Sequence, residues 1–151
     1  MVSFGSDESR AGPNPGVLSG DSGQSERGCP FCDLAPGQVW AHGRDAHAIF
    51  DHYPVSDGHT LVLPARHVGS IFALPAEERA SLWELVAEVR SRLQRTHHAE
   101  AFNIGVNDGE LAGQTVAHAH IHVIPRRRGD VPDPRGGVRW VVPDRARYWT
   151  D

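Results

Sequence analysis

The feature that most constrains this chain is a run of three alternating histidines, His118, His120 and His122, separated by single apolar residues. Successive side chains of a β-strand point to opposite faces of the sheet, so this spacing predicts three imidazoles in a row on one face. A row of imidazoles makes poor core material, because a buried polar group without a partner costs free energy. The run therefore predicts a functional strand over residues 116–124.

Two chemistries use such a row of histidines. Three imidazoles can hold a catalytic zinc ion. Alternatively, one imidazole nitrogen attacks a phosphorus atom while its neighbours handle charge and protons. The residues alone leave both alternatives open.

The only cysteines of the chain, Cys29 and Cys32, are separated by two residues. They cannot crosslink distant segments, which excludes a disulfide-rich secreted scaffold. The spacing suits a metal site and also a dithiol redox site. Two thiolates do not complete a tetrahedral zinc site, so a metal site needs two further ligands, which the ten histidines of the chain can supply.

The pattern of apolar residues predicts an α+β fold, a five-stranded antiparallel sheet with one long helix packed on it. The helix is expected over residues 75–96, where apolar side chains recur at helical spacing, namely Leu82, Leu85, Val86, Val89 and Leu93. Strands are expected over residues 38–42, 46–51, 59–63, 101–107 and 116–124.

Composition divides the 151 residues into three parts. Residues 1–28 are rich in glycine, serine and proline and are predicted to be a disordered tail. Residues 29–128 hold the strands, the helix and the histidines, and are predicted to form the catalytic domain. Residues 129–151 are predicted to be a mostly irregular surface strap, packed by its aromatic side chains.

Charge and hydropathy exclude some classes of function. The net charge of −4 argues against a general nucleic-acid binder, which usually carries a basic surface. No apolar run approaches the roughly 20 residues that cross a bilayer, and the first residues lack the features of a secretory signal. We therefore expect a cytoplasmic protein with no membrane partner.

A glycine-rich loop precedes the histidine run. Glycines allow backbone N–H groups to approach phosphate oxygens, and polar side chains beside them add hydrogen bonds. The loop spans residues 107–115 and contains Asn107, Gly113, Gln114 and Thr115. Such a loop alone is also typical of an ordinary hairpin.

Residues 112–126 resemble the signature of the histidine triad family, His-φ-His-φ-His-φ-φ, in which φ is apolar and Ala119 fills the first such position. Residues 58–67 resemble the Gly-His-x-Leu-Val-x-Pro-x-x-His segment of the same family. Cys29 and Cys32 resemble the cysteine pair of its zinc-bearing members. The resemblance covers about residues 29–128. Residues 129–140 differ from the corresponding segments of the better-known branches of the family. The identity of the leaving group is therefore the property that the resemblance implies least.

The resemblance implies a nucleotidyl hydrolase that cleaves dinucleoside polyphosphates or nucleoside phosphoramidates and releases a nucleoside monophosphate. It implies that His120 is the nucleophile and forms a covalent nucleotidyl-histidine, which water then cleaves. His122 would bind the phosphate and assist proton transfer to the leaving group. The alternative that we keep is a nucleotide-binding regulatory module with little turnover.

The resemblance also implies the remaining site residues. Asp51 would hold the ribose of a substrate of the adenosine or guanosine type, and Ile49, Phe50 and Leu61 would form an apolar pocket for the base. The phosphate would be contacted by Asn107, Gly113, Gln114 and Thr115. One structural zinc ion per chain would be held by Cys29, Cys32, His67 and His118. Members of this size suggest a homodimer, and a nucleic-acid partner is not expected.

Overall fold

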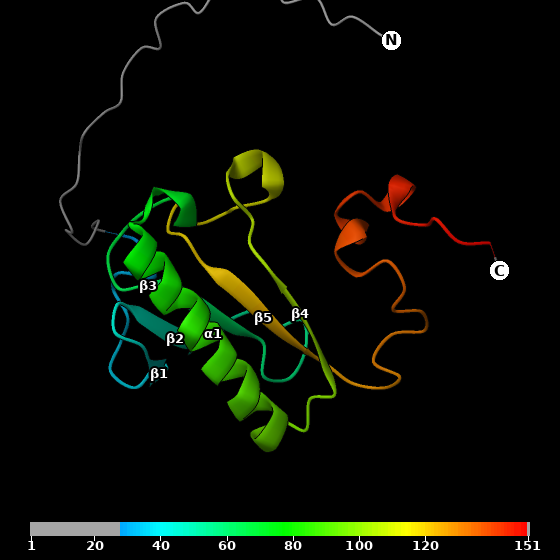
Figure 1. Cartoon of the computed structure of the whole chain (residues 1–151), viewed down its shortest axis with the longest axis horizontal. Helices are drawn as coiled ribbons and strands as arrows, with labels where there is room; N and C mark the ends of the chain where they lie inside the picture. The colour runs from blue at the N-terminus through cyan, green and yellow to red at the C-terminus, as the bar shows by residue number, and fades with distance from the viewer. Residues whose placement is uncertain (1–27, 151) are drawn as a thin grey trace, which may run out of the picture.

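The computed structural model describes residues 28–150, so the expected N-terminal tail, apart from Gly28, lies outside the described residues. These residues form one five-stranded sheet with one long helix packed on it, as expected (Figure 1). The strands are β1 (Val39–His42), β2 (Ala46–Phe50), β3 (Thr60–Pro64), β4 (Ala101–Gly105) and β5 (Ile121–Arg126). Their order across the sheet is β1-β2-β3-β5-β4, and every neighbouring pair is antiparallel.

The helix α1 (Ala76–Thr96) lies across one face of the sheet (Figure 1). It begins after Pro75, with Glu77 and Glu78 in its first turn, where carboxylates favour the positive end of the helix dipole. Its apolar stripe, which includes Leu82, Leu85, Val86, Val89 and Leu93, is buried against the sheet. The main core therefore lies between α1 and this face.

The opposite face of the sheet carries a row of four residues in register, Ile49, Leu61, His122 and Gly105, one from each of β2, β3, β5 and β4. His122 faces away from α1 because its strand neighbours Ile121 and Val123 are buried in the core beneath the helix. The row thus places His122 between two apolar residues on one side and a glycine on the other.

The strand expected over residues 116–124 is shifted. The structure begins β5 at Ile121, so His118 and His120 precede the strand and do not line one face of it. The reason is local bonding, because Ala119 N–H donates to the carbonyl of Val68 instead of joining the sheet ladder. β5 also continues through Pro125, where it pairs with β4 alone and the missing N–H is tolerated.

The C-terminal strap, residues 129–150 as the structure describes them, lies beyond the β4 side of the sheet (Figure 1). It contains two short 3-10 helices, η3 (Gly137–Val141) and η4 (Pro143–Arg145), and is otherwise irregular. Two shorter 3-10 turns, η1 (Ile71–Ala73) and η2 (Glu110–Ala112), precede the helix and the histidine run respectively. No helix among the described residues is long and apolar enough to cross a membrane.

The packing of α1 predicts how stability responds to truncation. Leu93 is fully buried, so Leu93→Ala should lower the free energy of unfolding by about 3 kcal/mol, through lost apolar burial and the cavity left behind. Leu111 is fully exposed, so Leu111→Ala is the matched control and should change stability little. Urea unfolding followed by circular dichroism measures both, and equal losses would contradict this account of the core.

Candidate active site

Two cysteines near the start of the described residues lie close to two histidines from later in the chain. The four residues are Cys29, Cys32, His67 and His118. Their ligand atoms all lie within 4.8 Å of one another. Cys29 Sγ and Cys32 Sγ each lie 3.5 Å from His118 Nδ1, and Cys32 Sγ lies 3.3 Å from His67 Nδ1. The structure therefore brings together all four residues that the sequence suggests as metal ligands.

The geometry of this cluster fits a tetrahedral metal ion. Metal–sulfur and metal–nitrogen bonds of zinc length place sulfur and nitrogen ligands about 3.6 Å apart in a tetrahedron, close to the spacings found here. His118 Nε2 lies 3.0 Å from the carbonyl oxygen of Pro64, to which it can donate, leaving the Nδ1 lone pair directed at the cysteines. Burial lowers the pKa of His118, which favours the neutral form that binds metals. The cluster could hold a metal ion.

The nucleophile suggested by the sequence, His120, is held by the same segment. Its Nδ1 lies 2.8 Å from the carbonyl oxygen of His118, so Nδ1–H donates to that oxygen and Nε2 keeps its lone pair. The ring of Phe31, which stands between the two cysteines in sequence, contacts the His120 ring edge-on at 5.2 Å. The orientation of His120 thus depends on the cysteine segment and on His118.

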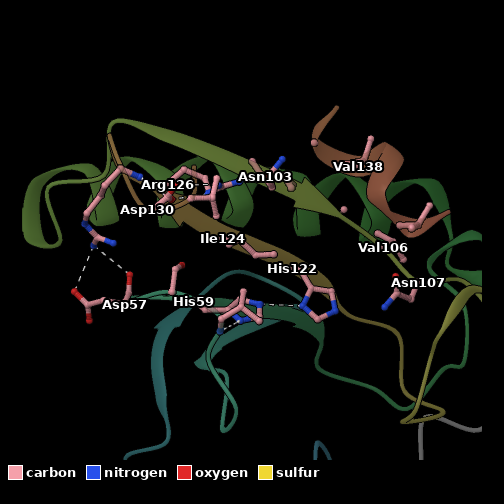
Figure 2. Close-up of a pocket in the computed structure, with 18 residues that line it drawn as sticks. Asp57, His59, Asn103, Val106, Asn107, His122, Ile124, Arg126, Asp130 and Val138 are labelled. Atoms are coloured by element: carbon pink, nitrogen blue, oxygen red, sulfur yellow. Dashed lines mark hydrogen bonds and ion pairs between the residues drawn. The ribbon is translucent and has the colours of Figure 1, made fainter. Parts of the chain in front are cut away.

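Asp51, His59 and His122 lie in contact, one after the other. The Asp51 carboxylate lies 3.4 Å from His59 Nδ1. His59 Nε2 lies 3.0 Å from His122 Nδ1, within hydrogen-bond distance (Figure 2). These three residues are also close enough to suggest a metal site. However, Asp51 and His122 approach opposite nitrogens of His59, which is the geometry of a proton relay and not of one shared ion.

The contacts support two arrangements of protons along this relay. In the first, His59 carries its hydrogen at Nδ1, 3.4 Å from the Asp51 carboxylate, and its Nε2 accepts from His122 Nδ1–H, so His122 Nε2 keeps its lone pair. In the second, His59 Nδ1 accepts from Val55 N–H, at 3.3 Å, and its Nε2–H donates to His122, whose Nε2–H is then a proton donor. The two arrangements hold the same number of protons and differ in whether His122 Nε2 accepts a proton or donates a hydrogen bond.

The environment keeps His122 neutral at pH 7. Burial, together with the neighbouring imidazoles of His120 and His59, lowers its pKa to about 4, and the Asp51 carboxylate opposes part of this shift. Burial also lowers the pKa of His59, again against Asp51. Both arrangements need neutral imidazoles, and the lowered pKa values favour the neutral forms near neutral pH.

A cavity of about 740 Å³ adjoins the relay. His59, His122 and Ile124 line it from the strands, and Val138 of η3 lines it from the strap (Figure 2). We call this cavity, between β4, β5 and the strap, the strap cleft. It lies beside His122 on the side of Gly105, away from Ile49 and Leu61.

The structure brings some of the expected nucleotide-binding residues to this face. Ile49 and Leu61 pair across β2 and β3 beside His122, in a small apolar cluster that also includes Leu63. Asp51 lies at the end of β2, where its carboxylate accepts from Tyr53 N–H at 2.8 Å. Phe50 is not brought to this face, because it follows Ile49 on the alternating strand.

The ring of Phe50 stacks on Trp40 at 5.1 Å and contacts His97 at the end of α1. Strand alternation thus places it on the helix side of the sheet, on the face opposite His122. The expectation that Phe50 contributes to a pocket for the base together with Ile49 is therefore corrected, since the two side chains point to opposite faces.

The residues of the glycine-rich loop differ in their contacts. Asn107 lines the strap cleft. Gln114 holds the loop together, because it accepts from Gly109 N–H and donates to the carbonyl of Gly69, both at 2.8 Å. Gly113 adopts a φ of 92°, which favours glycine, and Thr115 is exposed. A phosphate contact for these two residues stays a prediction.

His59 lies within residues 58–67, which resemble a family segment, but the sequence alone assigns it no role. A signal was present, because His59 directly precedes the apolar strand β3 and is itself buried. A histidine at the edge of an apolar strand needs a hydrogen-bond partner, and Asp51 stands eight residues earlier at the end of β2. The pairing could not be derived without the register of β2 and β3.

Comparison with known proteins agrees with this geometry. The sequence model of the HIT domain family matches residues 34–129, more than half of the chain. The chain belongs to the histidine triad family. Its relatives in this family include enzymes named for the hydrolysis of nucleotide bonds.

The bis(5'-nucleosyl)-tetraphosphatase (asymmetrical) of Schizosaccharomyces pombe is 38% identical over 93 residues, which are 62% of this chain and 51% of that enzyme. The chain thus spans about half the length of that relative. An adenylylsulfatase of Arabidopsis thaliana is 30% identical over 139 residues, which are 79% of this chain and 71% of that protein. The crystal structure of a Zn-bound histidine triad family protein from Mycobacterium smegmatis matches with a TM-score of 0.63 and 33% identity, over 76% of this chain and 90% of that one.

The relay predicts a pH dependence that can be measured by NMR. The ring protons of His122 should titrate with a midpoint near pH 4, and Asp51→Asn should lower this midpoint, because the carboxylate raises the pKa of His122. Asp108→Asn, which changes an exposed carboxylate, is the control and should leave it in place. The pKa of His122 in the fold lies below its usual 6.5, so its protonation destabilises the fold as pH falls from 6.5 towards 4.

A His122 midpoint near 6.5 would contradict the buried relay. A midpoint near 4 that does not move in Asp51→Asn would contradict only the electrostatic link between Asp51 and His122, and not the burial of His122.

Proposed function

We propose that this chain is a nucleotidyl hydrolase that releases a nucleoside monophosphate through a covalent nucleotidyl-histidine. The observation that carries the proposal is that two neighbouring imidazoles, His120 and His122, contact different partners. His120 donates its Nδ1–H to a fixed carbonyl oxygen, and His122 is connected through His59 to a carboxylate. The first suits a nucleophile and the second suits a proton carrier. Relatives named for nucleotide hydrolysis support the same chemistry.

In the first step, His120 Nε2 attacks the α-phosphorus of the substrate. A nitrogen–phosphorus bond forms, and the bond from phosphorus to the leaving group breaks. The anionic phosphate of the bound substrate favours a His122 ring protonated on both nitrogens; its Nε2–H gives its proton to the leaving atom, and the neutral ring that remains keeps its Nδ1–H directed at His59 Nε2. The hydrogen bond from Nδ1–H of His120 to His118 stabilises the positive charge that develops on the attacking ring.

In the second step, water replaces the leaving group. His122 Nε2, now without its proton, accepts a proton from the water as the oxygen attacks phosphorus, and the bond to His120 breaks. The proton that His122 gave to the leaving group is thereby replaced, and the nucleoside monophosphate is released. His122 thus acts as the acid when both of its nitrogens are protonated and as the base when it is neutral, while His59 Nε2 accepts from its Nδ1–H in both forms.

The nucleoside is proposed to lie over β2 and β3. Ile49 and Leu61 offer an apolar surface beside His122, and Asp51 can accept ribose hydroxyls, since each carboxylate oxygen has two lone pairs. Base preference, of the adenosine or guanosine type, stays a prediction. The homodimer and the cytoplasmic location also stay predictions.

The metal is proposed to be one structural zinc ion per chain, held by Cys29, Cys32, His67 and His118. Four protein ligands fill a tetrahedral site, so the ion supplies fold stability rather than an open position for a substrate. Its ligand His118 also supplies the carbonyl that orients His120. His118 would therefore act on the reaction by positioning, without contacting phosphate.

Removal of the nucleophile tests the proposal most directly. His120→Ala should lower AMP release from diadenosine tetraphosphate and adenosine 5'-phosphoramidate by roughly 10⁴-fold or more, because the covalent route is lost. Binding of AMP, measured by calorimetry, should persist. His42→Ala, on the exposed edge strand β1, is the matched control and should keep its rate.

If the wild type binds AMP but cleaves neither compound, the alternative of a nucleotide-binding regulatory module replaces the proposal. If His120→Ala cleaves as fast as the wild type, the covalent mechanism is wrong.

Loss of a cysteine tests the metal. Wild-type protein should contain about one zinc ion per chain, and Cys29→Ser should lose it and melt several degrees lower. Chelator should lower the melting temperature of the wild type towards that of the variant and leave the variant unchanged. A stoichiometry near zero in fully folded wild type, or equal melting temperatures, would refute a structural zinc ion.

A further inference from the structure

The contact between His59 and His122 lies where the pairing of β3 with β5 ends. The last pair of this ladder towards the start of β3 is Thr60 with Val123, and His59 directly precedes Thr60. Beyond this pair, β5 continues to Arg126 and pairs with β4 alone. The ladder between β3 and β5 therefore does not hold the backbone on the N-terminal side of His59.

That backbone forms a tight turn over residues 56–59, which we call the 56–59 turn. His59 N–H donates to the carbonyl oxygen of Ser56 at 3.0 Å, and Gly58 adopts a φ of 85°, which favours glycine. A Cβ added at Gly58 would lie 3.0 Å from the ring of His97, so the turn packs directly against the end of α1. The position of His59 thus depends on how this turn is held.

Arg127, the residue that follows β5, joins the turn to the end of α1. Its Nε and Nη2 both donate to the carbonyl oxygen of His97, at 3.1 and 2.6 Å. Its Nη2 also lies 3.2 Å from the carbonyl oxygen of Asp57, to which it donates, and 3.3 Å from the Asp57 carboxylate (Figure 2). One guanidinium therefore connects the ends of α1 and β5 with the 56–59 turn.

The backbone carbonyls are the partners that matter here. The Asp57 side chain is 78% exposed, so solvent screens its ion pair with Arg127 and the pair contributes little. His97 ends α1, where carbonyl oxygens have no partner inside the helix and a positive charge is favoured. The planar guanidinium presents several N–H groups at fixed angles and can serve two carbonyls at once, which an ammonium group does less well.

This contact spans the side of His59 that the sheet leaves open. On one side, the backbone of His59 is held by β2, because Asp51 N–H donates to the His59 carbonyl at 2.9 Å. On the other side, Arg127 holds the turn to the backbone that continues from His122. The 3.0 Å contact between the two imidazoles is therefore fixed from both sides.

We propose that Arg127 is a positioning residue for the reaction, because it holds the 56–59 turn and thereby keeps His59 against His122. This inference rests on the proposed function, in which His59 Nε2 accepts from the Nδ1–H of His122 while His122 gives and takes the catalytic proton. Arg127 touches neither of these imidazoles. It acts through the backbone of Asp57 and Gly58, two residues from His59 along the chain.

Hydrogen exchange measures the holding of the turn without any substrate. Arg127→Ala removes the bonds to both carbonyls, so the turn should open more often. The backbone N–H of His59 should then exchange with solvent roughly tenfold faster or more, while the amides of β3 that pair within the sheet keep their rates. NMR of the full chain, at a pH where the wild type is folded, resolves these amides individually.

Kinetics measures the consequence for the reaction. Arg127→Ala should lower kcat for adenosine 5'-phosphoramidate by roughly tenfold or more, since small misplacements of a group in the reacting assembly are costly. The dissociation constant of AMP, measured by calorimetry, should stay close to that of the wild type, because Arg127 is not among the residues proposed to bind the nucleoside. A loss in kcat without a loss in binding distinguishes positioning from a damaged nucleotide site.

Two further measurements separate positioning from general stability. The Arg127 side chain is partly exposed, so guanidinium added at millimolar concentration can reach the space left in Arg127→Ala and should raise its kcat. In a variant that is merely weakened in its fold, guanidinium, a denaturant, should lower the activity further. Arg127→Lys should keep part of the wild-type kcat, since an ammonium group can still donate to one of the carbonyls.

The matched control is Arg128→Ala, which removes the same charge from the next residue. Arg128 is exposed, and the hydrogen bond printed on this part of the backbone, from its N–H to Glu100, does not involve its side chain. The control should keep the wild-type exchange rate at His59 and the wild-type kcat. Melting temperature and zinc content are measured for every variant, so that a folding defect is recognised separately.

The outcomes separate this inference from the proposed function. If the wild type cleaves neither adenosine 5'-phosphoramidate nor diadenosine tetraphosphate, the proposed function fails, and the role in the reaction fails with it. If the wild type is active but His59 N–H exchanges at the same rate in Arg127→Ala, or exchanges faster with kcat unchanged, only the role of Arg127 is overturned. The same losses in Arg128→Ala, or a lowered melting temperature in Arg127→Ala with no rise of kcat in guanidinium, would also overturn it.

Discussion

The hydrogen bond from His120 Nδ1 to the carbonyl oxygen of His118 is the contact on which the candidate site depends. His118 is held at three points, with its Nδ1 directed at the two cysteines, its Nε2 at Pro64, and its carbonyl at His120. The four candidate metal ligands and the proposed nucleophile His120 are therefore parts of one assembly. A change in the cysteine segment would reach His120 through His118 and through the ring of Phe31.

This assembly explains why the histidine run leaves the sheet before β5 begins. A regular strand would place all three imidazoles on one face, where they would have one environment. Instead, the segment before Ile121 turns His118 into the metal cluster and leaves His120 between that cluster and His122. Three residues of one type thus lie in three different environments, because local backbone bonding gives each ring a different set of partners.

The sequence predicts the architecture because periodicity and turn residues report on burial. The helical stripe from Leu82 to Leu93 and the short apolar strands are confirmed, together with the gathering of the four expected metal ligands. The register of the sheet is what the sequence does not carry. Register joins Asp51 to His59 and His122, and strand alternation sends Phe50 to the helix side. Both depend on contacts between segments far apart in the chain.

The strap illustrates a second limit and a physical consequence. Its composition predicts a surface segment, and most of its described residues are exposed. Yet it forms one wall of the cavity beside His122, where its valines face a sheet whose arginines are already paired with aspartates. Charge neutrality is a property of pairs and cannot be seen in a count of arginines. The cavity beside His122 is therefore formed jointly by the sheet and by a segment whose composition alone predicts only a surface.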